Sequence, residues 1–221
     1  MGFFSSLFGK KQEEEKAPKK YEGNFFNIAR NGTLDQVKEA LKEGANVNEK
    51  NDEWCTPLMF AAEENNDPMV IKTLIDAGAI LESRTKGGAT PIMGAVQKNP
   101  NIDILKMLLK EGANVNRENE IGFTPLIYAA IYNSNPDFIT VLIEAGADIN
   151  YTNKIGYNAF LYAVLNNSME VIQRLVLHKA YVLQRDTNGL NALDHLIKQK
   201  TPEDSELYLY VLKVFNEYND A

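Results

Sequence analysis

Residues 124–150 read TPLIYAAIYNSNPDFITVLIEAGADIN and contain the start and stop signals of two short helices. Thr124 is an N-cap candidate, and Pro125 takes the first helical position, where its missing N–H costs nothing. Pro136 repeats this start signal, and Gly146 ends the second helix because glycine adopts a left-handed C-cap without strain. Two helices this short cannot bury their own apolar faces. We therefore expect them to stack on similar units.

Each of these two expected helices carries an apolar stripe. The first stripe consists mainly of small residues, which let a neighbouring helix approach closely, whereas the second consists of large ones. The two stripes are Leu126, Ala129 and Ala130 in the first helix, and Phe138, Val141, Leu142 and Ile143 in the second. The sequence predicts that both stripes lie in the interior of the stack.

The same signals recur along the chain at an almost constant step. The start motif is found, at steps of 34, 34, 34 and 33 residues, at Thr56-Pro57-Leu58, Thr90-Pro91-Ile92, Thr124-Pro125-Leu126, Asn158-Ala159-Phe160 and Asn191-Ala192-Leu193. The helix-ending pairs are Gly44-Ala45, Gly78-Ala79, Gly112-Ala113 and Gly146-Ala147. Because Ala29 matches Ala62 one unit later, a shortened first unit begins near residue 23.

This TPL…AA…GA pattern, with its step near 33 residues, resembles the ankyrin repeat, which has a β-turn and two helices per unit. The resemblance covers residues 23–221 and implies an all-α solenoid of about six stacked helix-turn-helix units with short β-turn tips. The expected units are 23–50, 51–84, 85–118, 119–152, 153–185 and 186–221. Residues 1–22 form the expected N-terminal tail, flexible and with a short amphipathic stretch.

The chain departs from the ankyrin pattern at three places. The family usually has a histidine after TPL that bonds to the cap threonine, and here that place holds Met59, Met93, Ile127 and Leu161. We therefore expect this local polar network to be absent. Lys179 stands where the helix-ending glycine belongs, and a positive φ there would cost about 1 kcal/mol. Thr201, Pro202 and Asp204 are expected to open a longer final helix.

Composition narrows the functional classes. The 221 residues carry a net charge of −7, and we find no basic stripe of the kind that nucleic-acid binding requires. Cys55 is the single cysteine, which excludes an intrachain disulfide and favours a reducing compartment, so we expect a cytoplasmic protein. No run of about 18 apolar residues is present that could cross a membrane as a helix.

Candidate catalytic groups are few, and we expect a non-enzymatic protein without cofactor or metal. The two histidines are His178 and His195, and neither has a cysteine or serine partner at a recognisable spacing. Asp194 precedes His195, but adjacent residues on a helix point to different sides. No metal-ligand cluster or phosphate loop appears, and the repeats leave no room for a catalytic domain. An enzyme with an unrecognised site is the weaker alternative.

The N-terminal tail carries a second functional hypothesis. At 100° per residue, four large apolar side chains fall on one side of a helix: Phe3, Phe4, Leu7 and Phe8. They could dip into a membrane surface, which would make the protein a membrane-surface adaptor peripheral to the bilayer. The other interpretation, which we favour, is a tail that contacts nothing or only caps the end of the array.

The ankyrin resemblance also implies where a protein partner binds. Members of the family present the turn tips and the exposed side of the first helices as a concave binding face. At the matching positions of units four and five the residues are mostly apolar or aromatic: Ile121, Phe123, Ile131, Tyr132, Ile155, Tyr157 and Leu165, with Trp54 on the tip of unit two. We expect these residues to contact another protein, with the chain acting as a monomer. The alternative is that neighbouring tips pack on each other.

Overall fold

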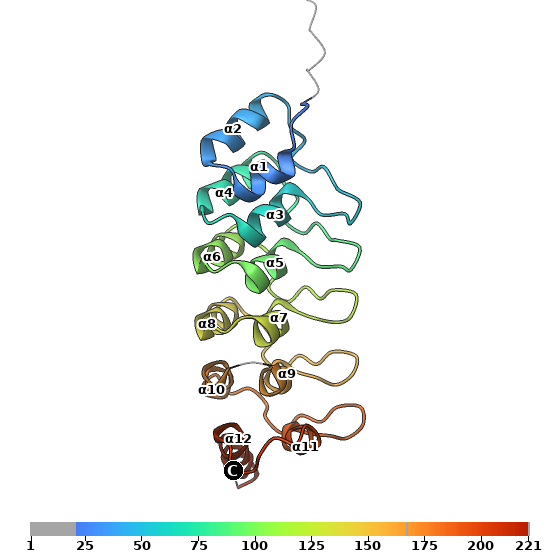
Figure 1. Ribbon diagram of the computed structural model, residues 1–221, viewed down its shortest axis with the longest axis vertical. Helices are drawn as coiled ribbons and strands as arrows, with labels where there is room; N and C mark the ends of the chain where they lie inside the picture. The colour runs from blue at the N-terminus through green and yellow to red at the C-terminus, as the bar shows by residue number, and fades with distance from the viewer. Residues whose placement is uncertain (1–20, 167, 221) are drawn as a thin grey trace, which may run out of the picture.

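The computed structural model describes residues 21–166 and 168–220, which form two columns of helices in one elongated stack (Figure 1). The inner column consists of α1 (Phe25–Asn31), α3 (Pro57–Glu64), α5 (Pro91–Lys98), α7 (Pro125–Tyr132), α9 (Ala159–Asn166) and α11 (Ala192–Lys198). The outer column consists of α2 (Leu34–Lys42), α4 (Pro68–Asp76), α6 (Ile102–Lys110), α8 (Pro136–Glu144), α10 (Met169–Leu177) and α12 (Glu206–Asn219).

Each helix pair forms one unit of the stack, numbered one to six from α1 and α2. The turns between units project on the side away from the outer helices, next to the inner column (Figure 1). No strand occurs among the described residues. The predicted all-α solenoid of stacked helix-turn-helix units is confirmed. Residues 1–20, which include most of the expected tail, lie outside the described residues.

Most helix starts follow the predicted caps. Thr124 accepts a hydrogen bond from the Ile127 N–H at 3.4 Å, and Thr33 forms a capping box with Gln36. Thr90 makes no side-chain cap bond, and its hydroxyl oxygen is buried without a hydrogen-bond partner among the described residues. The start of α5 is therefore defined by Pro91 and by backbone bonds rather than by a cap side chain.

One local polar network that we expected to be absent is present in unit two. The Thr56 N–H donates to Met59 Sδ at 3.4 Å, while the Thr56 hydroxyl accepts from the Met59 N–H at 3.4 Å. A thioether sulfur is a weak acceptor, but it lies where the reciprocal acceptor of a capping box belongs. The expectation was therefore wrong at Met59, because methionine supplies an acceptor that isoleucine and leucine lack.

The helix ends confirm the predicted left-handed caps. Gly112 has a φ of +96°, and Lys179 takes the equivalent conformation in unit five with a φ of +67°. These turns also connect the units, since the Asn48 side chain donates to the Gly78 carbonyl at 2.8 Å and accepts from the Ile80 N–H at 2.8 Å. The side-chain amide of Asn48 thus joins the helix-ending turns of units one and two through two hydrogen bonds.

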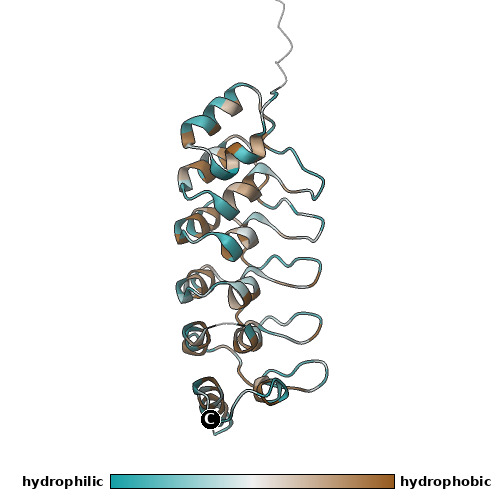
Figure 2. Cartoon of the chain, viewed as in Figure 1, coloured by the Kyte–Doolittle hydropathy of each residue, from teal (hydrophilic) through white to brown (hydrophobic). Residues whose placement is uncertain are grey.

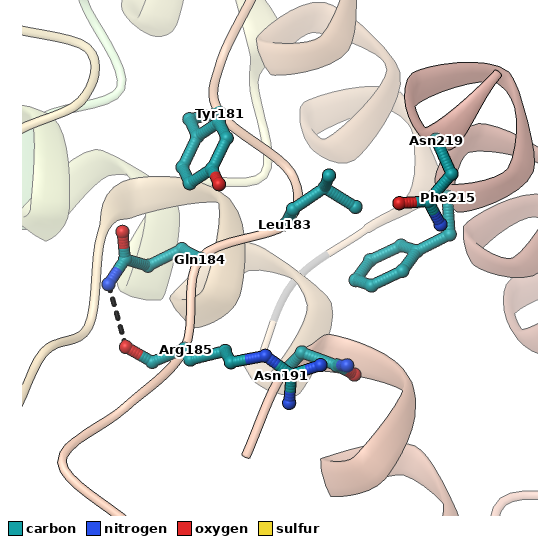
Figure 3. Close-up of a pocket in the computed structure, with 7 residues that line it drawn as sticks. All are labelled: Tyr181, Leu183, Gln184, Arg185, Asn191, Phe215 and Asn219. Carbon is teal, nitrogen blue, oxygen red and sulfur yellow. Dashed lines mark hydrogen bonds between the residues drawn. The ribbon is translucent and has the colours of Figure 1, made fainter. Parts of the chain in front are cut away.

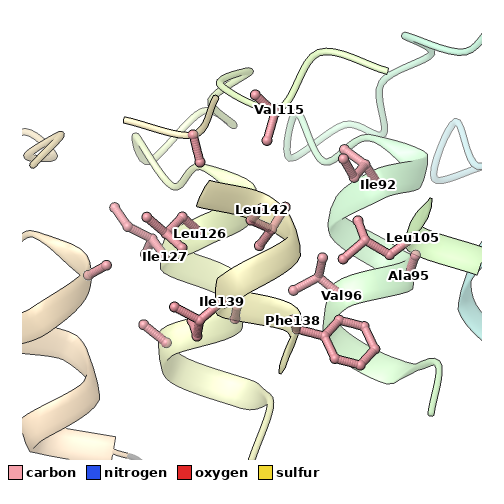
Figure 4. Packing of buried hydrophobic residues seen from close by; sticks show 14 of the residues in the cluster. Ile92, Ala95, Val96, Leu105, Val115, Leu126, Ile127, Phe138, Ile139 and Leu142 are labelled. Atoms are coloured by element: carbon pink, nitrogen blue, oxygen red, sulfur yellow. The ribbon is translucent and has the colours of Figure 1, made fainter. Parts of the chain in front are cut away.

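The interior of the stack runs between the two helix columns (Figure 4). The first predicted stripe, which includes Leu126, is buried throughout, as are Phe138 and Leu142 from the second. Ile139 is fully buried, whereas Val141 and Ile143 are only half-buried, so the buried face of α8 is rotated from the predicted one. Hydropathy also varies along the stack. Figure 2 shows α7 and α9 in brown, the hydrophobic colour, whereas α1 and α2 contain more hydrophilic residues, drawn in teal.

A ladder of asparagine amides links successive units at the turns after α3, α5 and α7. Asn65 Nδ2 donates to the carbonyls of Ala29 and Gly32, both at 3.0 Å. Asn99 Nδ2 repeats this one unit later, donating to Ala62 at 3.0 Å and to Asn65 at 2.9 Å. Their Oδ1 atoms accept backbone N–H groups two residues on, so each amide joins its own turn to the preceding unit.

The last helix begins later than the sequence predicts. Residues 203–205 form a turn, and α12 starts at Glu206, with Ser205 as its N-cap. The Ser205 hydroxyl accepts a hydrogen bond from the Tyr208 N–H at 3.3 Å. The expected start at Thr201 and Pro202 was therefore wrong, because two start signals lie close together and the second one is used.

Candidate partner-binding surface

The turn tips are shaped by one polar side chain at the start of each unit. Asn119 Oδ1 accepts hydrogen bonds from the Ile121 N–H at 3.1 Å and the Phe123 N–H at 2.8 Å. Such bonds let asparagine hold a turn through its own side chain. The corresponding residue in the other units is Asn51, Thr85, Asn153 or Asp186. Every tip from unit two to unit six therefore has the same backbone course.

Neighbouring tips are joined by backbone hydrogen bonds. The Lys86 N–H donates to the Glu53 carbonyl, and the Glu120 N–H donates to the Gly87 carbonyl, both at 3.1 Å. Ion pairs follow the same row, with Lys86 Nζ 3.6 Å from Glu53 and an Arg84 nitrogen 2.9 Å from Glu120. The tips of units five and six are joined in the same way, by the Thr187 N–H and the Ile155 carbonyl, whereas the tips of units four and five are joined by a side chain, with Lys154 Nζ donating to the Glu120 carbonyl at 3.4 Å.

Aromatic rings pack against one another beneath the tips of units four to six. The ring of Tyr162 lies between Phe123, at a centroid distance of 5.2 Å, and Tyr157, at 5.1 Å. Tyr157 also contacts the His195 ring at 5.4 Å. Phe123 and Tyr157 are consequently half-buried, so only part of each ring is left to contact another protein. These two rings thus pack on inner-helix residues, Tyr162 of α9 and His195 of α11, and not on the neighbouring tip.

Hydrogen bonds tie each of these tips to the inner helix of its own unit. Asn119 Nδ2 donates to the Tyr128 hydroxyl at 3.1 Å, and Asn153 Nδ2 donates to the Tyr162 hydroxyl at 2.8 Å. Burial raises the pKa of Tyr162, although the bond from Asn153 opposes this shift. These pairs were not predicted from the sequence, where their only signal is a nine-residue spacing between the turn residue and the ring.

In unit six the same spacing joins two ionisable residues. His195 Nε2 lies 3.1 Å from Asp186 Oδ2 and 3.3 Å from the Tyr157 hydroxyl. Burial pushes the pKa of Asp186 upward, but the N–H groups of Leu190 and Asn188 and the contact with His195 outweigh it, so the pKa is lowered. His195 therefore has a structural partner across the turn, and it does not pair with Asp194.

Four of the eight predicted contact residues expose large apolar side chains. Ile121 and Ile155 occupy equivalent positions on adjacent tips and are 59% and 49% exposed. Tyr132, at the end of α7, is 51% exposed. Ile131 and Leu165 are half-buried at equivalent places on α7 and α9, and neither of these helices contains a charged residue. Trp54 is exposed on the tip of unit two.

The inner helices of units one to three differ in character from those of units four and five. The Arg30 guanidinium lies 4.3 Å above the Phe60 ring, and Lys98 Nζ lies 2.6 Å from a Glu63 oxygen. Gly94 leaves room for this ion pair, since a Cβ on it would lie 2.8 Å from Glu63 Cγ. The inner face is therefore charged in its N-terminal half and uncharged across α7 and α9.

A cavity of about 520 Å³ opens between units five and six (Figure 3). It is lined by Tyr181, Leu183, Gln184, Arg185, Asn191, Phe215 and Asn219. The Arg185 guanidinium in this cavity already has partners within the chain. It donates to the Gly189 carbonyl at 2.6 Å and lies 3.5 Å from Asp194. This cavity was not predicted from the sequence. It forms where the linker between units five and six meets the end of α12.

The remaining candidate groups bring together no catalytic constellation. Cys55 is half-buried, and burial together with the charge of Glu63 raises its thiol pKa. No cluster of three or more metal-ligating side chains occurs among the residues that the structure describes. None of the described helices is both long and apolar enough to cross a bilayer. The four candidate membrane contacts, Phe3, Phe4, Leu7 and Phe8, lie outside the described residues.

Comparison with known proteins adds one match. A family model described as "Ankyrin repeats (3 copies)" matches residues 25–119, 101–153 and 126–210. These matches span units two to five completely and most of units one and six. No curated protein matches the chain.

Proposed function

The chain belongs to the ankyrin repeat family, whose members are generally protein–protein interaction modules, and we propose that it binds one protein partner through units four and five. The proposed contacts are the tips of these units and the adjoining ends of α7 and α9. Binding is non-enzymatic, involves neither cofactor nor nucleic acid, and is carried out by the monomer. A reducing compartment such as the cytoplasm suits its single cysteine.

The observation that carries this proposal is the exposure of Ile121, Tyr132 and Ile155 on adjacent units, whose tips are each held in shape by an asparagine side chain. A solvated turn does not need isoleucine at its tip, and leaving apolar area in water costs about 25 cal/mol per Å². Rigid attachment favours binding, because little conformational freedom is lost when the partner docks. Phe123 and Tyr157 support this surface from beneath, and Ile131 and Leu165 form its floor.

Site-specific photo-cross-linking tests the proposal. A photoreactive phenylalanine analogue replaces Tyr132 in the full chain, and cross-linked proteins from the native cell are identified by mass spectrometry. The control carries the analogue at Leu177, which is 70% exposed on the outer helix α10. We expect one protein to cross-link at position 132 and not at position 177. Equal cross-linking at both positions would mean that units four and five hold no specific surface.

Affinity measurements with the purified cross-linked protein then test individual residues. Tyr132→Ala and Ile155→Ser are expected to weaken binding by at least about 10-fold, as truncation of central contact residues does. Leu177→Ser should leave affinity unchanged. If Tyr132→Ala and Ile155→Ser bind as tightly as the wild type, the partner contacts another part of the array.

A further inference from the structure

The tip of unit two carries a tryptophan where the later tips carry a glycine. The Trp54 N–H donates to the Asn51 carbonyl at 2.9 Å. The same backbone bond is made at the equivalent positions of the later units by Gly88, Gly122, Gly156 and Gly189. Trp54 also shares their left-handed backbone, with a φ of +64° against +79° for Gly189. Tryptophan thus stands at a position whose geometry favours glycine.

Few local contacts of Trp54 offset the cost of this left-handed backbone. A residue with a Cβ is disfavoured in the left-handed region, most of all when its side chain is bulky. The indole is 53% exposed, and its ring contact among the described residues is the Lys50 ammonium, 5.5 Å from the ring centre. Strained residues of this kind persist mainly at binding and active sites, where they contact a ligand.

The groups around Trp54 indicate what such a ligand would offer. Within the part of the chain that the structure describes, Lys50 has no ion-pair partner and the indole N–H has no acceptor. Lys86, in contrast, is paired with Glu53 at 3.6 Å. The tip therefore presents an apolar ring face, a neutral hydrogen-bond donor and an unpaired cation side by side. A carboxylate next to an apolar side chain complements all three groups.

We propose that Trp54 is a contact residue, and that the partner places an acidic residue and an adjoining apolar side chain against Trp54 and Lys50. This inference rests on the proposed function and extends the partner's footprint from units four and five across unit three to the tip of unit two. The tip of unit three, Lys86-Gly87-Gly88-Ala89, has few side chains that would obstruct a partner crossing it.

The strain is tested on the protein alone by urea unfolding. Trp54→Gly should raise the urea midpoint, because glycine accepts this backbone conformation without strain. Gly189→Ala is the matched reverse change, since its added Cβ meets nothing within 4 Å and reports only the backbone cost. It should lower the midpoint. A lower midpoint for Trp54→Gly would show that the ring stabilises its own tip, and the inference would fail.

Binding is tested with the purified protein that cross-links at position 132. Trp54→Gly should weaken its affinity by at least about 10-fold although the variant is the more stable protein. Lys50→Gln should weaken affinity by a smaller factor and reduce its dependence on salt concentration. Wild-type affinity for Trp54→Gly, together with weak binding by Tyr132→Ala, overturns this inference alone. Wild-type affinity for both variants overturns the proposed function as well.

Discussion

The side-chain amide of Asn153 donates to the hydroxyl of Tyr162 at 2.8 Å, and both residues are buried. The same asparagine holds the turn of unit five through its Oδ1 atom, which accepts from the Ile155 and Tyr157 N–H groups. One side chain therefore sets both the shape of the tip and its position over α9. The exposed isoleucine at that tip owes its fixed place to this connection.

Removing the hydroxyl of Tyr162 tests that connection. Tyr162→Phe should destabilise the protein by about 1–2 kcal/mol, because it leaves a buried amide donor without an acceptor. Tyr128→Phe is the matched change in unit four, where the ring is only half-buried, and it should cost less. Urea unfolding measures both. Equal stability of Tyr162→Phe and wild type would mean that water or another group replaces the lost acceptor.

Backbone strain at the helix ends predicts that substitutions at two equivalent positions, Gly112 and Lys179, change the free energy of unfolding in opposite directions. Gly112→Val should cost about 1–3 kcal/mol, since Gly112 has a φ of +96° and its added Cβ meets nothing within 4 Å. Lys179→Gly should stabilise the protein by up to about 1 kcal/mol, because Lys179 holds a φ of +67°. Chemical denaturation of the two variants checks both signs. The assignment of these caps would be wrong if Gly112→Val unfolded at the wild-type midpoint.

The hydroxyl of Tyr151 gives a prediction at alkaline pH. Burial, followed by a short hydrogen bond to Glu118, raises the pKa of Tyr151 to about 12. The folded-state pKa lies above the unfolded value of 10, so the stabilisation is fully present below pH 10. It should be lost as the pH rises from 10 to 12. The difference between the ultraviolet titrations of wild type and Tyr151→Phe isolates this tyrosine, and a midpoint near 10 would contradict the contact with Glu118.

Asp186 gives the complementary prediction at acid pH. Its folded-state pKa is lowered, so its stabilisation is present above the unfolded pKa of 3.8 and is lost as the pH falls below that value. Wild type should therefore lose stability in acid more steeply than Asp186→Asn, which keeps the turn acceptor but cannot ionise. Asp52→Asn, on an exposed tip, is the control. Parallel acid unfolding curves for wild type and Asp186→Asn would show that the carboxylate is not stabilised by folding.

The sequence predicted the features whose signals are local. Thr124, Pro125 and Gly146 each act within a few residues, and their repetition at a constant step identified the stack and its units. Contacts between units were not predicted, because the partner of each residue lies about one unit away. The amide of Asn65, for example, donates to backbone carbonyl oxygens of unit one. Every residue has such a carbonyl, so the sequence does not show which one accepts the bond.

The candidate surface was predicted by position rather than by exposure. Matching to the repeat correctly placed Ile121, Ile155 and Tyr132 at exposed sites. It could not show that Phe123 and Tyr157 turn inward onto Tyr162, because ring direction depends on which residue the next unit supplies. Unit five supplies a tyrosine at that place, whereas unit three has Gly94. The same reasoning could not reveal the strain at Trp54, which only the backbone angles expose.

The asparagine ladder also has a genetic consequence. Asn99 and Asn133 occur at the same place in successive units, and each reaches back to the carbonyls of the unit before it. An in-frame loss of residues 85–118 would bring Asn133 to the carbonyls of Ala62 and Asn65 that Asn99 now contacts. The ladder contact would then be present again at the new junction. A gene for this array can therefore lose or gain a whole unit in this region while the protein keeps its asparagine ladder, whereas a change of any other length would break the ladder.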